Sequence, residues 1–504
     1  MTVGTMMFEE FTADAGPNIL ERWFAPSTSP SFLRARWIWL RCLGAIFFSA
    51  FYSLYFQIHG LIGPRGILPA GEYLEAVHHA LGAKGYWLAP TLLWINAGDR
   101  MLSAIVWTGF IASAAIIFNL WPRLSIAVAS ICFLSFVAAA QEFSGYQSDG
   151  MLLEAAFLSI FLAPRGIRPG MAIDQPPSRA AVFMLQWEWF RIYFESGLVK
   201  ILSGEEQWRN LTAMDKYYEN GPLPSWIGWY VQQWPHSFHA FSAGLTLVVE
   251  LFVVWLLFAP RKTSLCRLIV FLIVTPLQIG IILTANYAFL NYLVLCLGIL
   301  LLDDSILRGP APVPKTKKPS IVAAIVLPAI FMTTIASFVM PSFPTAVLLE
   351  PFRIANRYGL FAIMTRNRYE IEFQGTRDGV TWIPYPFRYK PQDVRKRPGL
   401  YAPYQPRFEW NLWFASLGSA QENQWVLNTE ARLLENSPPV LQLFAGNPFE
   451  GTPPIAMRAV AYQYWFTTRE ERARTGAWWR REPLGAYAPA ARRAADGTIT
   501  FDND

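Results

Sequence analysis

A series of long apolar segments limits most strongly how this chain can fold. A helix that crosses the hydrocarbon core of a bilayer needs roughly 20 predominantly apolar residues. Long windows of this kind lie at 37–58, 100–121, 124–141, 180–202, 238–259, 266–284 and 319–340, and two shorter runs lie at 150–163 and 287–302. The sequence therefore predicts a polytopic α-helical membrane bundle with about nine transmembrane helices in residues 37–340.

The composition of the chain supports this membrane assignment. Only 15% of the 504 residues are charged, compared with about 25% in an ordinary globular protein. The 21 Trp and 37 Phe residues would be difficult to bury in a water-soluble core of this length, whereas Trp and Tyr are favoured at the two faces of a bilayer. These features argue against a soluble cytosolic enzyme.

Charge and cysteine content exclude several other classes of function. The net charge is +6, but the 42 basic residues are spread along the chain without a long basic run, so no nucleic-acid partner is expected. The four cysteines all lie inside apolar segments without paired spacing, which argues against a disulfide framework or a zinc site. There is no P-loop, GxGxxG, GxSxG or HExxH motif. We expect no metal and no cofactor.

The basic residues in the short loops predict the orientation of the bundle. With residues 1–36 as an amphipathic segment in the cytoplasm, every second loop is rich in Lys and Arg, as the positive-inside rule requires. These loops carry Arg123, then Arg165, Arg168 and Arg179, then Arg261, Lys262 and Arg267, and finally Arg308, Lys315, Lys317 and Lys318. Nine crossings then place residues 341–504 outside the cytoplasm, in a bacterial periplasm or in the lumen of the endoplasmic reticulum.

Residues 341–504 have the composition of a soluble extracytoplasmic domain with an α+β or β-sandwich-like fold. Strands are predicted at 368–375 and 457–466, and Asp378-Gly379 is a hairpin turn signal after the first of them. Helices are predicted at about 410–417 and 424–445. About 160 residues are enough for this domain to bury its own core.

Ionisable residues inside the apolar helices are the candidates for a functional or structural cluster, because each is costly in a membrane unless it is paired or hydrated. Arg191 and Glu195 lie four residues apart, which predicts an ion pair within one helix. Lys200 lies near the outer end of the same helix and is expected to extend its amine to the interface. Glu154 and Glu250 are alternative partners that would neutralise Arg191 or Lys200 across helices.

A functional hypothesis competes with this structural one. If the cluster lined an outward-facing cavity, desolvation would allow Lys200 to serve as a base. Trp208, in the loop that follows, fits either an interfacial anchor or part of a lid. His239 and His236 have a spacing at which two imidazoles can share a metal, but no third ligand is evident.

Several blocks of the chain resemble the lipase maturation factor family. They are residues 66–70, 149–154, 186–191, 197–200, 208–212, 238–239 and 249–251 in the apolar half, and residues 358–361, 378–382, 402–407 and 475–481 in the polar half. They include Asp149, Trp208 and His239. The resemblance implies a multi-pass membrane protein, whose animal members lie in the endoplasmic reticulum and help secreted dimeric lipases reach their folded form. It also implies a client protein, bound through the C-terminal domain, and membrane lipids as partners.

A second and more distant resemblance concerns chemistry. Residues 193–200, with Trp208 soon after, look like the helix end that carries the base in vitamin K-dependent gamma-carboxylase and its bacterial relatives with horizontally transferred transmembrane (HTTM) helices. This resemblance implies that Lys200 acts as a base on a lipid or quinone. We prefer a non-enzymatic maturation factor and keep a carboxylase-like enzyme as the alternative. A transporter is disfavoured because the chain shows no internal repeat.

Overall fold

The computed structural model describes residues 18–259, 263–316, 318–340, 342–494 and 498–501. Each of the nine apolar windows coincides with a helix. These helices are α2 (Leu33–Ile62), α5 (Asp99–Ile117), α6 (Pro122–Val137), α7 (Gln147–Leu162), α8 (Arg179–Leu202), α12 (His236–Leu251) with the 3₁₀ turn Val253–Phe258, α13 (Thr263–Thr284), α14 (Leu290–Leu297) with the 3₁₀ turn Gly298–Leu301, and α16 (Ile321–Val339).

Five of these helices are long and apolar enough to cross a membrane within the described residues: Leu33–Ile62, Asp99–Ile117, His236–Phe258, Ser264–Thr284 and Ile321–Val339. The count of nine is therefore not confirmed. α8 has the length of a span but carries several charged side chains. It lies at the centre of the bundle, against α7, α12, α14 and α16, so its polar groups face protein.

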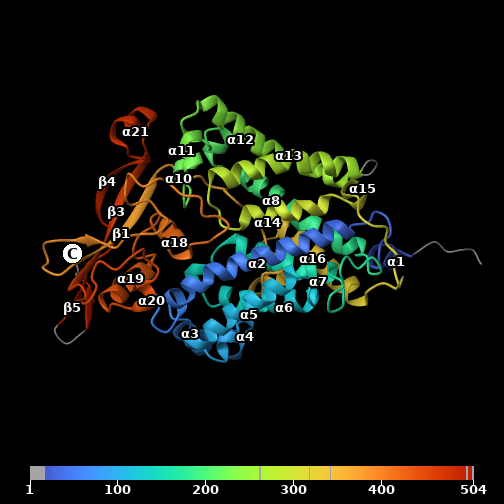
Figure 1. Ribbon diagram of the computed structural model, residues 1–504, viewed down its shortest axis with the longest axis horizontal. Coiled ribbons are helices and arrows are strands. Elements are labelled where there is room, and N and C mark those ends of the chain that lie inside the picture. The colour runs from blue at the N-terminus through green and yellow to red at the C-terminus, as the bar shows by residue number, and fades with distance from the viewer. Residues whose placement is uncertain (1–17, 260–262, 317, 341, 495–497, 502–504) are drawn as a thin grey trace, which may run out of the picture.

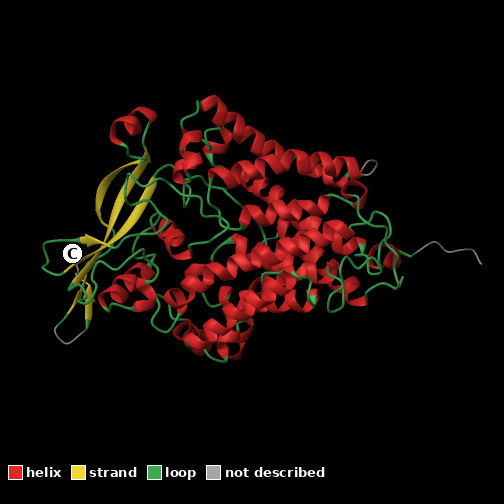
Figure 2. Ribbon diagram, in the orientation of Figure 1, coloured by secondary structure: helices red, strands yellow, loops and turns green. Residues whose placement is uncertain are grey.

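The bundle has two chemically different ends. At one end, residues 18–32, 163–178, 303–316 and 318–320 pack together; Val313, for example, donates its backbone N–H to Ile173. We call this the basic end. At the opposite end, the C-terminal sheet covers the bundle (Figure 1). Figure 2 shows that the strands gather there alone, and we call it the sheet end.

The described strands form one antiparallel sheet of six strands in the order β2-β1-β3-β5-β6, with β4 also paired to β3. The predicted strands are confirmed as β1 (Arg368–Thr376) and β3 (Ala456–Phe466), and the others are β2 (Ile383–Pro384), β4 (Trp479–Ala486), β5 (Ala491–Arg493) and β6 (Ile499–Phe501). A sandwich of two sheets is not confirmed.

The predicted turn after β1 is confirmed in detail. Asp378 accepts hydrogen bonds from the backbone N–H groups of Val380 (2.8 Å) and Thr381 (2.7 Å). Gly379 has φ +75°, which glycine adopts without the steric cost that a side chain would bring. The turn leads into β2, which pairs with the end of β1.

The predicted helix at 410–417 begins earlier, as α18 (Arg407–Ala415), and the single helix predicted at 424–445 is wrong. That segment forms α19 (Gln424–Leu434) and α20 (Pro438–Leu441). Asn436 between them has φ +55°, and two prolines follow, which restrict the preceding backbone to non-helical angles. The helix predicted to continue through this point is therefore broken.

Short helices occupy the connections. They are α1 (Ile19–Phe24), α3 (Ala70–Leu81), α4 (Gly85–Leu88), α9 (Glu206–Arg209), α10 (Tyr217–Asn220), α11 (Trp226–Gln232), α15 (Asp304–Leu307), α17 (Pro344–Leu349) and α21 (Arg469–Thr475). Of the predicted segment 1–36, residues 1–17 lie outside the described residues, and α2 already begins at Leu33. The boundary predicted at residue 341 stays a prediction.

Candidate functional site

A buried polar cluster joins α7, α8 and the chain that follows α16. Arg191 on α8 forms a salt bridge with Glu154 on α7, and both side chains are fully buried. The second Glu154 oxygen accepts hydrogen bonds from Asn356 (backbone N, 2.9 Å; Nδ2, 3.0 Å) and from the Tyr358 hydroxyl (2.8 Å). Arg191 also donates to the Asn356 carbonyl (2.7 Å). The two charges are therefore neutralised and enclosed.

The ion pair predicted within α8 is not the one that forms. Glu195 instead accepts the backbone N–H of Tyr358 (2.5 Å), while Arg191 pairs across helices, which was the alternative. Glu188 is also fully buried beside this cluster, and the sequence analysis missed it. Its position three residues before Arg191 places it on the same helical face, which is the signal that would have found it.

Lys200 is paired rather than extended to the interface. Only 1% of its surface is exposed, and Nζ lies 2.7 and 3.0 Å from the two carboxylate oxygens of Glu250 on α12. The ring of Trp208 lies over the amine at 5.1 Å, and its Nε1 donates to the Phe361 carbonyl (2.9 Å). The prediction that Lys200 snorkels is wrong, and so is that of an interfacial Trp208, because both are buried.

Asp149 and Arg407 form a third buried pair, at the sheet end. Asp149 is the third residue of α7. Its two carboxylate oxygens accept hydrogen bonds from the two terminal nitrogens of Arg407 on α18, at 2.7 and 2.8 Å. Arg407 also donates to the Phe143 carbonyl (2.9 Å). Arg407 lies in a block matched to the family, but nothing in the sequence identified it as the partner of Asp149.

A fourth contact joins the loop between α8 and α12 to the sheet. Arg368 on β1 is fully buried, pairs with Glu370 and donates to the backbone carbonyls of Glu219 (3.0 Å) and Pro222 (3.1 Å). Lys390 completes the group, 2.9 Å from Glu370. Extended strands place side chains i and i+2 on one face, so Arg368 and Glu370 point together at this loop.

His239 has a structural contact. It is buried, and Nε2 lies 3.0 Å from the Trp234 carbonyl. His236 instead pairs with Asp215 (2.9 Å). Among the described residues, no group of three or more His, Cys, Asp or Glu side chains has a geometry that would hold a metal ion.

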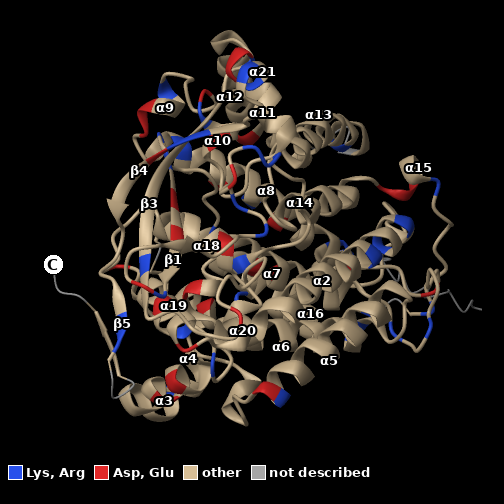
Figure 3. Ribbon diagram, turned by 60° about the vertical axis from the view of Figure 1, so that its left-hand side comes forward, with Lys and Arg blue, Asp and Glu red and all other residues tan. Residues whose placement is uncertain are grey.

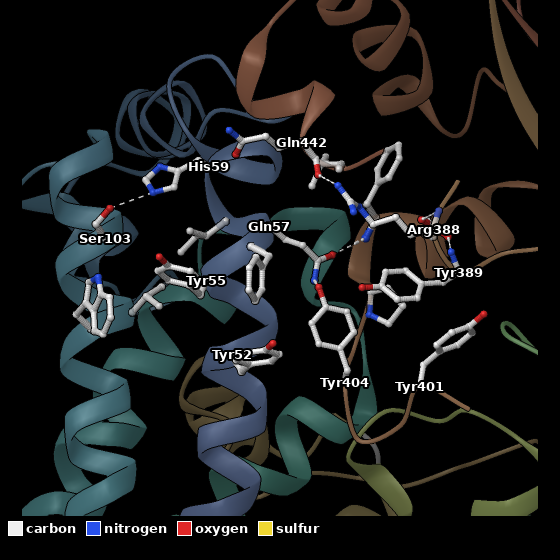
Figure 4. Close-up of a pocket in the computed structure, with 18 of the residues that line it drawn as sticks. Tyr52, Tyr55, Gln57, His59, Ser103, Arg388, Tyr389, Tyr401, Tyr404 and Gln442 are labelled. Atoms are coloured by element: carbon white, nitrogen blue, oxygen red, sulfur yellow. Dashed lines mark hydrogen bonds between the residues drawn. The ribbon is translucent and has the colours of Figure 1, made fainter. Parts of the chain in front are cut away.

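A cavity of about 890 Å³ lies where the membrane helices meet the C-terminal region (Figure 4). Tyr52, Tyr55 and Gln57 on α2 form one side. Arg388 and Tyr404, from the irregular chain between β2 and α18, form the opposite side. The lining is thus largely aromatic, with a few convergent polar groups, and this size is typical of pockets that accept small ligands.

Comparison with known proteins identifies the family. A model of the lipase maturation factor transmembrane domain matches residues 34–309, and one of the lipase maturation factor C-terminal domain matches residues 354–489. The chain belongs to the lipase maturation factor family.

Individual relatives agree with this assignment over nearly the whole chain. Lipase maturation factor 1 of Bos taurus is 30% identical over 92% of this chain and 91% of its own length. Lipase maturation factor 2 of Gallus gallus is 29% identical over 90% of this chain and 81% of its own length. No solved structure shows a significant match.

The two lipase maturation factor domains meet in the buried clusters. Glu154 and Arg191 lie in the matched transmembrane domain, whereas Asn356 and Tyr358 lie in the matched C-terminal domain. The pair Asp149–Arg407 joins the same two domains. The ionisable residues that the sequence singled out therefore connect the family's two domains.

The carboxylase-like alternative receives no support from these comparisons or from this geometry. A base must reach its substrate, but Lys200 is enclosed by Glu250 and Trp208. Lys200 lines neither the 890 Å³ cavity nor a second cavity of about 670 Å³ at the basic end.

Asp99, His59 and Ser103, at the 890 Å³ cavity, are hydrogen-bonded in the same sequence as the Asp, His and Ser of a hydrolytic triad. His59 Nδ1 lies 2.8 Å from Asp99, and Nε2 lies 3.0 Å from the Ser103 hydroxyl. A triad also needs hydrogen-bond donors for the oxyanion beside the serine. The side chains one turn further along α5 that line the cavity are Val106, which has no donor, and Trp107, whose only donor is its indole N–H. The contact joins the last turn of α2 to the first turn of α5, where the Asp99 carboxylate complements the helix dipole.

Proposed function

We propose that this chain is a membrane-embedded maturation factor that assists the folding or assembly of secreted proteins such as lipases. The family assignment supports this role, since the relatives are named lipase maturation factors. The observation that carries the proposal is the set of buried clusters between the two family domains. They hold the sheet in a fixed position on the bundle.

The proposed topology has nine crossings, with the N-terminus in the cytoplasm and the C-terminal region outside it. Alternation of the described loops supports it: the basic loops 163–178 and 303–316 lie together at one end of the bundle, and the loops that contact the C-terminal region lie at the other. Figure 3 shows Lys and Arg in the loops of the end opposite the sheet. The membrane would be a bacterial inner membrane, with the sheet in the periplasm, or that of the endoplasmic reticulum in a eukaryote.

The proposed client surface is the tip of the sheet farthest from the bundle. Val380 in the β1–β2 turn is 82% exposed, and Ile383 and Ile455 nearby are 41% and 53% exposed. Ile455 donates its backbone N–H to Thr376 at the end of β1 (2.8 Å), which brings the two segments together. Exposed aliphatic side chains grouped at one site are typical of protein contacts.

A pair of matched substitutions tests this function. The full chain is co-expressed with a secreted dimeric lipase in animal cells that lack lipase maturation factor 1, and lipase activity per mass of secreted lipase is measured. Ile455→Asp should lower this specific activity at least several-fold, whereas Leu484→Asp on β4, 55% exposed, should leave it unchanged. Equal activity of wild type, both variants and an empty vector would refute the maturation role.

A further inference from the structure

The cavity of about 670 Å³ at the basic end has an unusual charge. It lies between the start of α2, the α7–α8 loop and the start of α16. It is lined by five basic side chains and one carboxylate: Arg36, Arg123, Arg165, Lys315, Lys318 and Asp174. We call it the basic pocket. Its one carboxylate is already engaged, because Lys315 forms a salt bridge with Asp174.

Arg36 differs from every other buried basic side chain that the structure describes. Each of the others has a carboxylate within 4 Å: Arg191, Lys200, Arg267, Arg368, Lys390 and Arg407. Arg36, which is 2% exposed, donates only to backbone carbonyls, those of Gln175 (2.6 Å), Met171 (2.6 Å) and Ala172 (3.1 Å). Carbonyl groups satisfy its N–H donors. Asp304 and Asp174 interact with it only from beyond 4 Å, because Asp304 accepts hydrogen bonds from the start of α2 and Asp174 pairs with Lys315.

Neighbouring guanidinium groups increase this imbalance. Arg123 donates from Nε to the Ala163 carbonyl (2.7 Å), and its terminal nitrogens have no carboxylate partner among the described residues. Arg165 also forms no salt bridge with any residue that the structure describes. Basic residues that served only to orient the bundle would be hydrated at its surface. Arg36 is buried and Arg123 half-buried, whereas Arg165, Lys315 and Lys318 are exposed around them. The two enclosed guanidinium groups favour an anion, because an unpaired charge is costly away from water.

The surroundings of the basic pocket indicate which anion it fits. Ile321 and Val322 line it at the first turn of α16, and they are 75% and 63% exposed. Ile325 continues the same exposed apolar surface along this 19-residue candidate span. A soluble phosphate would use only the guanidinium groups, whereas a phospholipid would use both the charge and this apolar surface.

We propose that the basic pocket binds the phosphate headgroup of an anionic phospholipid, with an acyl chain along Ile321, Val322 and Ile325 of α16. Arg36 and Arg123 bind the phosphate oxygens, since guanidinium groups match phosphate geometry. Basic pockets between transmembrane helices are a recognised way to hold such headgroups. The bound phosphate supplies the direct counter-charge that no described residue provides within 4 Å of Arg36.

The test uses the full chain in detergent and native mass spectrometry with phosphatidylglycerol, phosphatidylcholine or inorganic phosphate. Phosphatidylglycerol should bind at least about ten-fold more tightly than phosphatidylcholine. Arg123→Gln/Arg165→Gln should remove most of this preference. These residues are chosen because both are at least partly exposed, so that the variant folds; an unchanged unfolding midpoint confirms it.

Arg168→Gln is the matched control, because Arg168 is exposed in the same loop as Arg165 but does not line the basic pocket. It should keep the wild-type preference for phosphatidylglycerol. Equal affinity for both lipids, or an equal loss in the control, would overturn the proposal. So would inorganic phosphate that competes with the lipid at the lipid's own concentration, because the ligand would then be a soluble anion.

Discussion

Between the membrane helices and the C-terminal region, buried cations meet carboxylates, whereas at the basic end Arg36 meets only carbonyl oxygens. In the first arrangement no ion or ligand from outside the protein is needed to balance the charge of Arg191, because Glu154 neutralises it. The second leaves a charge that has no carboxylate within 4 Å among the described residues, although Asp304 and Asp174 interact with it from farther away. The difference teaches that pairing, more than burial, separates a structural charge from a candidate binding site.

The largest expected effect follows from removal of one partner of an enclosed pair. Glu154→Leu should lower the free energy of unfolding by about 3–5 kcal/mol, because Arg191 is left buried without a counter-charge. Thermal unfolding in detergent measures this effect. Glu72→Gln, on the exposed face of α3, should stay within about 0.5 kcal/mol of wild type. If Glu154→Leu/Arg191→Leu were no more stable than Glu154→Leu, the pairing would not be the cause.

A somewhat smaller effect is expected at Lys200, since its partner Glu250 is partly accessible. Lys200→Met should cost about 3 kcal/mol. Lys200→Arg should cost less, because the charge is retained although the side chain is larger. Unfolding midpoints and client maturation are measured for both. Normal stability with loss of function in both variants would contradict the structural role and favour a lysine that does chemistry.

The sequence predicted the elements better than the partners. Apolar length placed a helix at each predicted window, because a continuous apolar run has few alternatives to a helix in a membrane, but only five of these helices are candidate spans within the described residues. Spacing along α8 favoured Glu195 as the partner of Arg191, since that contact is local. The actual pairing depends on Asn356 and Tyr358, which return to the bundle more than 150 residues later in the chain. No local pattern encodes such a contact.

The interface residues show the same limit. Trp208 has the composition of a membrane anchor, and only the position of Lys200 and Phe361 makes it a buried ring. The basic pocket was visible in the sequence only as loops rich in Lys and Arg. The lack of a described carboxylate within 4 Å of Arg36 is a property of tertiary packing and was not predictable from spacing.

Glu430 on α19 provides the acidic counterpart of Arg36. It is fully buried and forms no salt bridge within the described residues. Burial raises its pKa to about 8, so the folded protein holds a proton that the unfolded chain releases above its ordinary pKa of about 4.5. The resulting stability is fully present below pH 4.5 and is lost as the pH rises through 8.

Glu430→Gln removes this titration. The wild type should lose roughly 2–3 kcal/mol of stability relative to the variant between pH 6 and pH 8, since each pH unit over which only the folded state holds the proton corresponds to about 1.4 kcal/mol. Unfolding midpoints across this pH range measure the difference. Glu482→Gln on β4, which is exposed, should keep the wild-type profile. Parallel profiles for wild type and Glu430→Gln would show that Glu430 is ionised in the folded state.

The smallest expected effect on stability is at the hydrogen bond between His59 and Ser103 in the 890 Å³ cavity, where water competes with the protein contacts. The His59 side chain is 31% exposed and that of Asp99 54%, so water replaces the Ser103 hydroxyl readily. Ser103→Ala should therefore cost at most about 1 kcal/mol, and a serine-directed fluorophosphonate should label wild type and variant equally. Selective labelling of the wild type, lost in Ser103→Ala, would show instead that His59 activates a nucleophile. His59, Asp99 and Ser103 would then form an active site, because a serine without a paired imidazole lacks this reactivity.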